Sequence, residues 1–526
     1  MLDEIVRRNA LRFPRKAALI GEQSQSTWAE LDERVNRLTH ALEALGLTRG
    51  DRIALLLGNC PEYFELYFAC ARGGFIAVPL NYRLTVPEAR QILSAAEPAL
   101  LVAGSGYASQ AAELRTVLPG IRHHWILGGA PAPGASLYAA ALAAAPSTPV
   151  ASRSVEGDTF AMFFTSGTTG LPKGAMVAHG NLIANGYNQA IADASRAEDI
   201  NLVGTPVYHV GAVFMAITYM MLGCTQVVLP QFTPTAWLAA LARHRATVAL
   251  LIPTMINSLL NEPTLESYDR ASLRLIFYGG GPMPPTVLER ALRAFRCGFT
   301  QGYGLTETLE ATFLVTADHV LGGTPAQQRR LASAGREAVG AEVRIVDDAG
   351  IDVPAGTVGE ILIRSRSVIS GYWRQPELAA KVLRGEWFCT GDLGYLDEDR
   401  YLFVVDRKTD MVVSGGVNIY TKEIEEVLYQ HPAVREAAVF GLPDEQWGEM
   451  VTAAVALRSG AAAGEAVGAA AGAAVGAADL ITWCRERLAG FKAPKRVVFL
   501  AELPKNPSGK ILKREIKREL TAARTP

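Results

Sequence analysis

The segment TSGTTGLPKG, residues 165–174, combines residue types that suit the binding of an anion. Hydroxyl donors, small glycines and one lysine occur together in it: Thr165, Ser166, Gly167, Thr168, Thr169, Gly170 and Lys173. Because it follows the apolar run FAMFF, we expect it directly after a buried strand, where backbone N–H groups can point at a phosphate. It is not a Walker A loop, since Gly174 rather than serine or threonine follows Lys173. Taken alone, the segment also fits an ordinary glycine-rich turn.

Further motifs follow this segment in a fixed order along the chain. They are QGYGLTE at 301–307, WFCTGD at 387–392, DRKTDMVVSGGVNIYTKEIE at 406–425 and PKNPSGKILKRE at 504–515. Each has an ordinary interpretation by itself: the pair Thr306-Glu307 fits a helix cap, and Lys510 fits a solvated basic tail. Together they resemble the motifs of the adenylate-forming superfamily of acyl-CoA synthetases, luciferases and nonribosomal adenylation domains. The resemblance covers essentially the whole chain.

The resemblance implies an acid–CoA ligase whose first step uses ATP and Mg²⁺ to turn a carboxylic acid into an acyl-adenylate. It implies that Tyr303 stacks on adenine, Thr306 bonds the α-phosphate and Glu307 places Mg²⁺. Asp392 would bind the ribose hydroxyls, and Lys510 would bridge the carboxylate and the α-phosphate. The resemblance also assigns the phosphate segment 165–174 to the binding of ATP or AMP. The remaining residues that it assigns to this nucleotide are Gly279, Gly280, Gly281, Gln301, Gly302, Gly304 and Arg407. Such a site must neutralise and align two anions that repel each other.

The second step, transfer of the acyl group to CoA, requires the thiol to reach the carbon that Lys510 approaches in the first. The resemblance implies that the C-terminal domain rotates about a hinge at Asp406. It also assigns the pantetheine tunnel to Ser414, Gly415, Gly416 and Val417. By itself, His209 in PVYHVGAVF would be a buried structural histidine. The resemblance places it between the acyl pocket and the CoA tunnel.

The acyl pocket is expected at Tyr208, Val213 and Phe214, and around 253–260 and 279–281. These segments contain no lysine or arginine. A second carboxylate would be left unpaired there, which disfavours diacids. The residue types favour an apolar tail, and both a fatty acid and an aromatic acid fit them.

Other functions compete with this interpretation. An amino-acid adenylation module is disfavoured because no aspartate lies in 208–214, and because LGGT at 321–324 has threonine where a carrier domain needs serine. An adenylating enzyme with another acceptor stays open, as does a luciferase-like oxidase, since both form the same adenylate. A non-enzymatic nucleotide-binding module would have lost some catalytic positions, and here every expected position is filled.

The elements that must position these residues can be read from periodicity. Between Thr27 and about Leu250, strands such as RIALLL and TVALLI alternate with helices such as WAELDERVNRLTHALEAL, which predicts a largely parallel α/β sheet. From Gly340, strands and turns predict a β-rich subdomain, and after Asp406 a small α+β unit follows. The resemblance implies two stacked α/β subdomains and a mobile C-terminal domain. We expect domains at 1–405 and 406–526, with a Gly/Ala-rich insertion at 460–479.

Charge and cysteine content limit the partners and the compartment. The 51 basic and 52 acidic side chains nearly cancel, so the chain lacks the field of a dedicated nucleic-acid binder. Six scattered cysteines without C-x-x-C spacing favour a cytoplasmic location. No apolar run is long enough to span a membrane. The basic residues around Lys510 could contact anionic lipid weakly. Monomer and homodimer both stay open.

Overall fold

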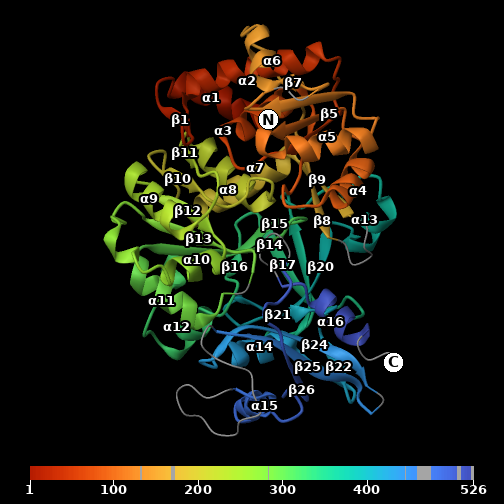
Figure 1. Cartoon of the computed structure of the whole chain (residues 1–526). Helices are drawn as coiled ribbons and strands as arrows, with labels where there is room; N and C mark the ends of the chain where they lie inside the picture. Colours follow the sequence, from red (N-terminus) through yellow and green to blue (C-terminus); the bar gives the residue numbers. More distant parts are fainter. Residues whose placement is uncertain are drawn as a thin grey trace. The chain divides into compact units, whose positions relative to one another are not determined.

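The structure is a computed structural model that describes residues 1–130, 133–166, 172–281, 283–444, 446–458, 475–505 and 511–522. The chain divides into two compact units. The first consists of Met1–Val343 and Leu362–Cys389, and the second of Arg344–Ile361 and Thr390–Pro526. Figure 1 traces the chain from the N-terminus to the C-terminus and labels its helices and strands.

A seven-stranded sheet forms one α/β layer of the first unit. Its order is β7-β6-β5-β3-β4-β8-β9, and every pair is parallel except the hairpin β8–β9. The strands are β3 (Arg52–Leu56), β4 (Ile76–Pro79), β5 (Leu100–Gly104), β6 (His123–Leu127), β7 (Ser136–Leu137), β8 (Thr159–Ser166) and β9 (Pro172–Ala178). The accompanying helices are α1 (Asp3–Arg12), α2 (Trp28–Ala44), α3 (Pro61–Gly73), α4 (Val86–Ala96), α5 (Ala108–Val117) and α6 (Tyr138–Ala144). The continuous apolar runs of the parallel strands are typical of a covered sheet.

A nine-stranded sheet forms the second α/β layer, in the order β16-β15-β14-β13-β12-β10-β11-β1-β2. Its strands are β1 (Ala17–Ile20), β2 (Gln25–Thr27), β10 (Ile200–Val203), β11 (Thr225–Val228), β12 (Val248–Leu251), β13 (Leu275–Tyr278), β14 (Gly298–Leu305), β15 (Leu309–Leu314) and β16 (Arg336–Glu337). Its helices are α7 (His179–Ala192), α8 (Val210–Met221), α9 (Pro234–His244), α10 (Pro253–Leu260), α11 (Pro285–Phe295) and α12 (Pro325–Arg330). The strands from β1 to β14 in this order pair in parallel.

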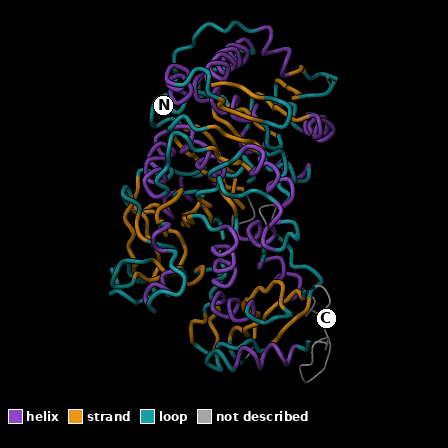
Figure 2. The backbone as a smooth tube through the Cα atoms, turned by 90° about the vertical axis from the view of Figure 1, so that its left-hand side faces the viewer, coloured by secondary structure: helices purple, strands orange, loops and turns teal. Residues whose placement is uncertain are grey.

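Side chains that alternate along β13 separate the two faces of this sheet. Ile276 packs in a core with Trp237 of α9 and Leu288 of α11. Phe277, the next residue, points the other way, and its ring centroid lies 6.1 Å from that of Phe214 on α8. Helices therefore lie on both sides of these strands. Figure 2 shows the helices of the chain in purple and the strands in orange. The face that carries Phe277 meets α8, the helix of the predicted acyl-pocket residue Phe214.

Two smaller sheets complete the chain. The first has the order β17-β18-β20-β19 with β21 paired to β20, and the second has the order β23-β22-β25-β24 with β26 paired to β25. Their strands are β17 (Ala341–Val346), β18 (Gly359–Ser365), β19 (Leu383–Arg384), β20 (Trp387–Leu396), β21 (Leu402–Arg407), β22 (Val412–Ser414), β23 (Val417–Ile419), β24 (Val434–Asp444), β25 (Gly448–Leu457) and β26 (Arg496–Phe499). The helices are α13 (Pro376–Val382), α14 (Thr421–Tyr429), α15 (Ala477–Arg485) and α16 (Lys513–Ala522). Ile424 and Leu480 pack on one face of the last sheet, and Ile516 packs on the other.

The element predictions are confirmed where they rest on periodicity: RIALLL, TVALLI and the Trp28 helix become β3, β12 and α2. Periodicity alone indicated one sheet, but the alternating region supplies two, in agreement with the two stacked α/β subdomains that the resemblance implies. Strands β1 and β2 belong to the second sheet, beside β11. Most of the predicted insertion at 460–479 lies outside the described residues, and Ala477 begins α15. No helix in the described ranges combines the length and apolar character needed to cross a membrane.

Candidate active site

The predicted adenine wall lies at the carboxyl ends of two adjacent parallel strands. Tyr278, the last residue of β13, pairs with Gln301 of β14. Gly279 therefore lies beside Gly302, and a Cβ built on it would lie 2.8 Å from the carbonyl oxygen of Gly302. Gly280 adopts a positive φ of +76°. Ligands of α/β sheets bind at this edge, so the structure brings Gly279–Gly281 together with the QGYG motif at a place suited to a nucleotide.

A bulge and a tight turn position Thr306 and Glu307. The pairing of β14 with β15 shifts register between Tyr303 and Gly304. A Cβ on Gly304 would lie 1.6 Å from the carbonyl oxygen of Leu309, so only glycine fits there. The amide of Leu305 donates to the Thr308 hydroxyl at 2.9 Å, which closes the turn. Thr306 and Glu307 thus lie at a strand-to-strand turn, not at a helix cap.

A tyrosine that the sequence analysis did not identify connects Glu307 with Lys173. The Tyr372 hydroxyl donates to Oε1 of Glu307 at 2.9 Å, and the Lys173 ammonium lies 5.9 Å from the centroid of the Tyr372 ring. Tyr372 is buried, and its burial, together with the nearby Glu307 carboxylate, raises the pKa of the Tyr372 hydroxyl. Tyr372 therefore stays a neutral donor that orients Glu307. The feature of the sequence that could have indicated Tyr372 is the aromatic pair Tyr372-Trp373, which follows strand β18.

Pairing of β9 with a remote segment explains why Lys173 and Tyr372 meet. Lys173 lies on β9, opposite Thr165 of β8. The next part of β9 pairs with a remote segment, since the amide of Trp373 donates to the carbonyl of Gly174 at 2.8 Å and Ala175 forms a bridge with Tyr372. Thr165 and Lys173 are therefore placed at the two ends of the predicted phosphate loop. The Ser166 side chain, Gly167, Thr168, Thr169, Gly170 and the remote Lys510 lie outside the described residues.

The donor set around Glu307 fits Mg²⁺ held with nucleotide phosphates. Mg²⁺ is usually bound by one or two carboxylates, substrate phosphates and water rather than by a cage of protein ligands. Within the described ranges no group of three or more His, Cys, Asp or Glu side chains could hold a metal. A single oriented carboxylate beside Lys173 matches that pattern.

The predicted ribose ligands lie in the second unit. Asp392 of β20 pairs with Arg407 of β21, and Nε of Arg407 lies 2.9 Å from Oδ1 of Asp392. The amide of Asp392 donates to the Thr390 hydroxyl at 3.0 Å. The Asp392 side chain is largely buried, while that of Arg407 is exposed. The structure thus brings together the two residues expected near ribose and phosphate.

The predicted hinge residue Asp406 connects β21 with α14. Its carboxylate accepts hydrogen bonds from the amide and the hydroxyl of Thr421, the first residue of α14. The Lys513 ammonium also donates to the Thr421 hydroxyl at 2.8 Å. The carboxylate therefore compensates the open N–H groups at the start of this helix. Asp406 belongs to the second compact unit.

The segment assigned to the CoA tunnel is a two-residue hairpin. Ser414 of β22 pairs with Val417 of β23, with Gly415 and Gly416 between them at φ of +60° and +78°. Two successive positive φ angles are what a tight hairpin turn of this type requires. The amide of Gly415 donates to the carbonyl of Trp447 at 2.8 Å. The glycines are therefore explained by the turn itself, apart from any ligand.

His209 lies at the start of α8, next to a group of tyrosine rings. Its ring centroid is 4.5 Å from that of Tyr208, which in turn contacts Tyr82 edge-on at 5.3 Å. Burial lowers the pKa of His209 to about 4, so the imidazole is neutral at pH 7. Its Nε2 is buried and has no hydrogen-bond partner among the described residues. Asn59 fixes the preceding chain by accepting from the amide of Val207 at 2.9 Å.

Among the predicted acyl-pocket residues, Phe214 faces the aromatic side of the nine-stranded sheet. Val213 and Phe214 are buried on α8, and Phe214 meets Phe277 of β13, which meets Phe313 of β15 at 6.3 Å. The acidic residue Glu310 also lies on this face, and the sequence analysis missed it. The feature that could have indicated Glu310 is that it is a charged residue inside the otherwise mainly apolar run LEATFLV.

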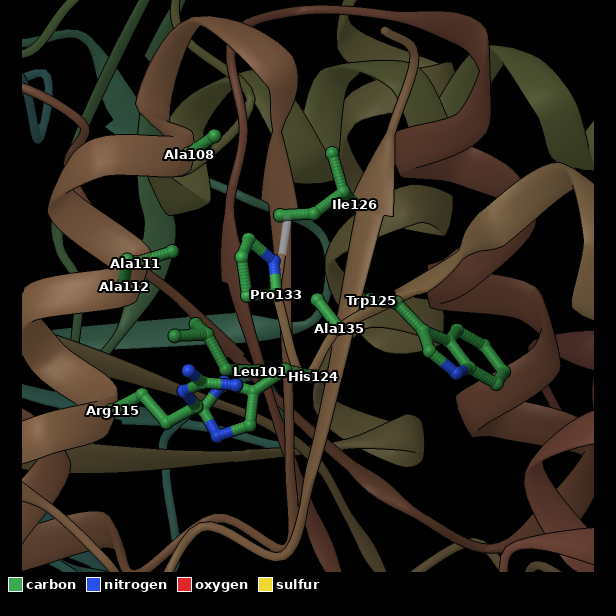
Figure 3. A pocket seen from close by; sticks show the side chains of 10 residues that line it. All are labelled: Leu101, Ala108, Ala111, Ala112, Arg115, His124, Trp125, Ile126, Pro133 and Ala135. Atoms are coloured by element: carbon green, nitrogen blue, oxygen red, sulfur yellow. The ribbon is translucent and has the colours of Figure 1, made fainter. Parts of the chain in front are cut away.

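A separate small pocket lies beside β5, β6 and α5 (Figure 3). Its lining is apolar except for Arg115 and His124. None of the residues predicted to bind ATP, acid or CoA lines it. We therefore do not assign the reaction to this pocket.

Comparison with known proteins agrees with this arrangement. Residues 6–373 match the family model of the AMP-binding enzymes, and residues 423–510 match that of the AMP-binding enzyme C-terminal domain. A feruloyl-CoA synthase of Amycolatopsis sp. is 36% identical over 512 residues, which cover 97% of both chains. A fatty acid–[acyl-carrier-protein] ligase of Streptomyces coeruleorubidus, ScoC, is 36% identical over 97% of this chain and 94% of its own.

Solved structures share the fold of this chain. The amide bond synthetase McbA from Marinactinospora thermotolerans superposes with a TM-score of 0.86 at 31% identity, covering 99% of this chain and 100% of McbA. The large α/β part and the smaller C-terminal part expected from the motifs are thereby confirmed. The chain belongs to the AMP-binding enzyme family, the adenylate-forming ligases, and it is an AMP-forming acid–thiol ligase that uses ATP, Mg²⁺ and CoA.

Proposed function

We propose that the enzyme adenylates an apolar carboxylic acid, aromatic or fatty, and transfers the acyl group to CoA. One observation carries the proposal: Gly279 directly follows β13, beside Gly302 of β14, and Phe277 of β13 lies on the buried face that meets α8. An acid whose carboxylate reacts at that edge would lay its tail against the aromatic face. The relatives named for ferulate and for fatty acids support an apolar acid.

In the adenylation step, a carboxylate oxygen would attack the α-phosphorus of ATP, and the bond to pyrophosphate would break. Thr306 would donate to the α-phosphate, and Lys173 would neutralise the departing pyrophosphate. Lys510 would bridge the carboxylate and the α-phosphate. Glu307, oriented by Tyr372, would hold Mg²⁺ together with phosphate oxygens, where the ion supplies charge neutralisation. Thr165 and the remaining phosphate segment would cradle the phosphates.

Residues from several of the sequence motifs would hold the nucleoside. Tyr303 would stack on adenine, with Gln301 and the Gly279 segment beside it. Asp392 would accept hydrogen bonds from the ribose hydroxyls, and Arg407, 2.9 Å from it, would keep that carboxylate oriented.

In the transfer step, the CoA sulfur would bond to the acyl carbon, the bond from that carbon to the phosphate oxygen would break, and AMP would leave. The thiol proton would pass to solvent. We place the domains at 1–405 and 406–526 with the hinge at Asp406, and the pantetheine at the hairpin Ser414–Val417. His209, neutral at pH 7, would separate the acyl pocket from the thiol path without adding charge.

The acceptor distinguishes this function from its alternatives. ScoC is named for a carrier protein and McbA for amide formation, although all share the adenylation fold. The test mixes enzyme, acid and ATP and measures pyrophosphate. It then adds CoA, acyl carrier protein or an amine in separate reactions and measures AMP and the product. We expect a thioester with CoA; an amide, a carrier-bound product alone, oxygen uptake or no turnover would overturn the proposal.

The acid would be identified with a panel scored by pyrophosphate release. Saturated fatty acids of graded length, benzoates and cinnamates cover the two classes that the pocket allows. We expect turnover with at least one class and none with malonate-like diacids. Efficient turnover of a diacid would contradict the apolar pocket.

We also propose that the enzyme acts in the cytoplasm. Cys70, Cys224 and Cys484 are buried thiols and form no disulfide. Buried thiols in a large enzyme suit a reducing compartment. Fractionation of cells that express the tagged chain tests this, and recovery from an exported fraction would contradict it.

A further inference from the structure

Glu310 is turned toward the acyl side of the sheet by the bulge between β14 and β15. Gly302 pairs with Phe313, but after the register shift Gly304 pairs with Glu310. Strict alternation from Phe313 would have sent Glu310 to the opposite face. Because of the bulge, its side chain shares a face with Gly302 and Phe313. This is the face that meets α7 and α8.

The glycine at 302 leaves the room that the Glu310 carboxyl occupies. A Cβ built on Gly302 would lie 2.5 Å from Oε2 of Glu310 and 2.5 Å from the edge of the Phe277 ring. Phe277 also contacts Phe214 of α8. The carboxyl is therefore adjacent to the aromatic face assigned to the acid, directly behind the glycine wall.

This carboxyl and one neighbouring group retain unused hydrogen-bonding capacity. Glu310 is 7% exposed, and its Oε2 has no hydrogen-bond partner among the described residues. The same holds for Nδ2 of Asn185, whose Oδ1 accepts from the Glu310 amide at 2.9 Å. Asn185 is fully buried. Buried polar atoms of this kind are costly unless water or a ligand satisfies them.

We propose that Glu310 is a specificity-determining residue that hydrogen-bonds a hydroxyl group at the far end of the acid substrate. The inference rests on the proposed function and narrows its substrate class from apolar acids to acids with a distal hydroxyl, such as hydroxyaryl acids. A pure hydrocarbon tail that reached this wall would leave the carboxyl unpaired. The remainder of the tail would still lie against Phe214 and Phe277.

The protonation state of Glu310 favours a hydroxyl over a cationic group. Burial, and in second place the Asp193 carboxyl, raise the pKa of Glu310 to about 8. At pH 7 the group is therefore mostly a neutral acid, which can donate and accept at once. A hydroxyl matches both roles, whereas an ammonium group would need a carboxylate.

The test compares matched pairs of acids that differ by one hydroxyl: cinnamate with 4-hydroxycinnamate, phenylacetate with 4-hydroxyphenylacetate, and octanoate with 8-hydroxyoctanoate. Acid-dependent pyrophosphate release gives kcat/KM for each. In the wild-type enzyme at least one pair should favour the hydroxylated member by about 10- to 100-fold, the usual discrimination for a buried polar group left unpaired. In Glu310→Leu the ratio should fall to about one or invert, while Glu310→Gln should keep part of it.

Glu65→Gln is the matched control. Glu65 is also a buried glutamate, and it accepts hydrogen bonds from Arg34 and Tyr138, which are not among the predicted site residues. This variant should keep the wild-type ratio. If the wild type activates acids but shows a ratio near one for every pair, the inference is overturned and the proposed function still stands. Equal loss for both members of a pair in Glu310→Leu would also overturn it, as would the same ratio change in Glu65→Gln. Absence of any turnover would instead refute the proposed function.

Discussion

Replacing Tyr372 by phenylalanine removes one hydroxyl and keeps the buried ring. In the structure that hydroxyl donates to Oε1 of Glu307 at 2.9 Å, and the ring lies under the Lys173 ammonium. The variant therefore keeps the packing and the contact with Lys173. Only the orientation of the carboxylate assigned to Mg²⁺ is lost. Tyr372 is a positioning residue, and adenylation should slow because Glu307 is no longer fixed.

The magnitude follows from the kind of bond. A hydrogen bond to a charged group contributes about 1.5–3 kcal/mol. If the full amount is expressed in the adenylation transition state, the rate falls by about 10- to 100-fold. The acyl-transfer step should keep its rate when it starts from preformed acyl-adenylate, since that step needs neither ATP nor Mg²⁺.

The assay measures pyrophosphate release across a Mg²⁺ titration in the wild type and in Tyr372→Phe. The variant should need more Mg²⁺ to reach half of its maximal rate, a change that a general packing defect would not produce. Tyr138→Phe is the control, because the Tyr138 hydroxyl likewise donates to a buried carboxylate, Glu65, at 2.6 Å, and neither residue belongs to the site. Its rate and Mg²⁺ dependence should match the wild type.

Two results would refute the reasoning. One is an unchanged adenylation rate in Tyr372→Phe with an intact fold. The other is an equal slowing of adenylation and of transfer from preformed adenylate, which would mean that the hydroxyl supports the fold rather than Glu307.

Three further predictions concern the predicted hinge at Asp406, Lys510 and the buried acid Glu310. Lys510→Ala should abolish adenylation yet transfer acyl groups from preformed adenylate to CoA, and loss of both half-reactions would contradict its assignment. Asp406→Pro should preserve adenylation and impair thiolation by stiffening the hinge; because the Asp406 carboxylate also binds Thr421, Asp406→Ala is the control, and an equal thiolation defect there would point to the helix contact instead. Glu310, with an ordinary pKa of 4.5 raised to about 8, holds a proton in the folded state that the unfolded chain releases, so its contribution to stability is present at low pH and is lost as pH rises through about 8. The thermal midpoint of the wild type minus that of Glu310→Gln should therefore fall between about pH 5 and pH 9, and a constant difference would argue against the raised pKa.

The sequence predicted those parts of the fold and site that depend on neighbours along the chain. Gly279 directly follows a strand, and the two glycines between Ser414 and Val417 indicate their own turn. Periodicity likewise located β3, β12 and α2.

What the sequence did not reveal depends on pairing between distant segments. Tyr372 reaches Glu307 because its segment bridges to Ala175 of β9, far away along the chain. β1 and β2 lie in the second sheet because β1 pairs with β11, while the strands that follow them build the first sheet. Glu310 faces α7 and α8 because of one extra residue in β15, and strict alternation predicts the opposite face. Such choices are decided by packing between elements, which a pattern of residue types does not record.

The shared space above Gly302 makes positions 302 and 310 mutationally dependent on each other. A side chain on 302 would compete for this space with both the Glu310 carboxyl and the Phe277 ring, because its Cβ would lie 2.5 Å from each. Single changes at position 302 should therefore be poorly tolerated while Glu310 and Phe277 are present, and a larger residue there becomes admissible only after both are shortened. Libraries that vary positions 277, 302 and 310 together would therefore find variants that stepwise selection starting at 302 misses.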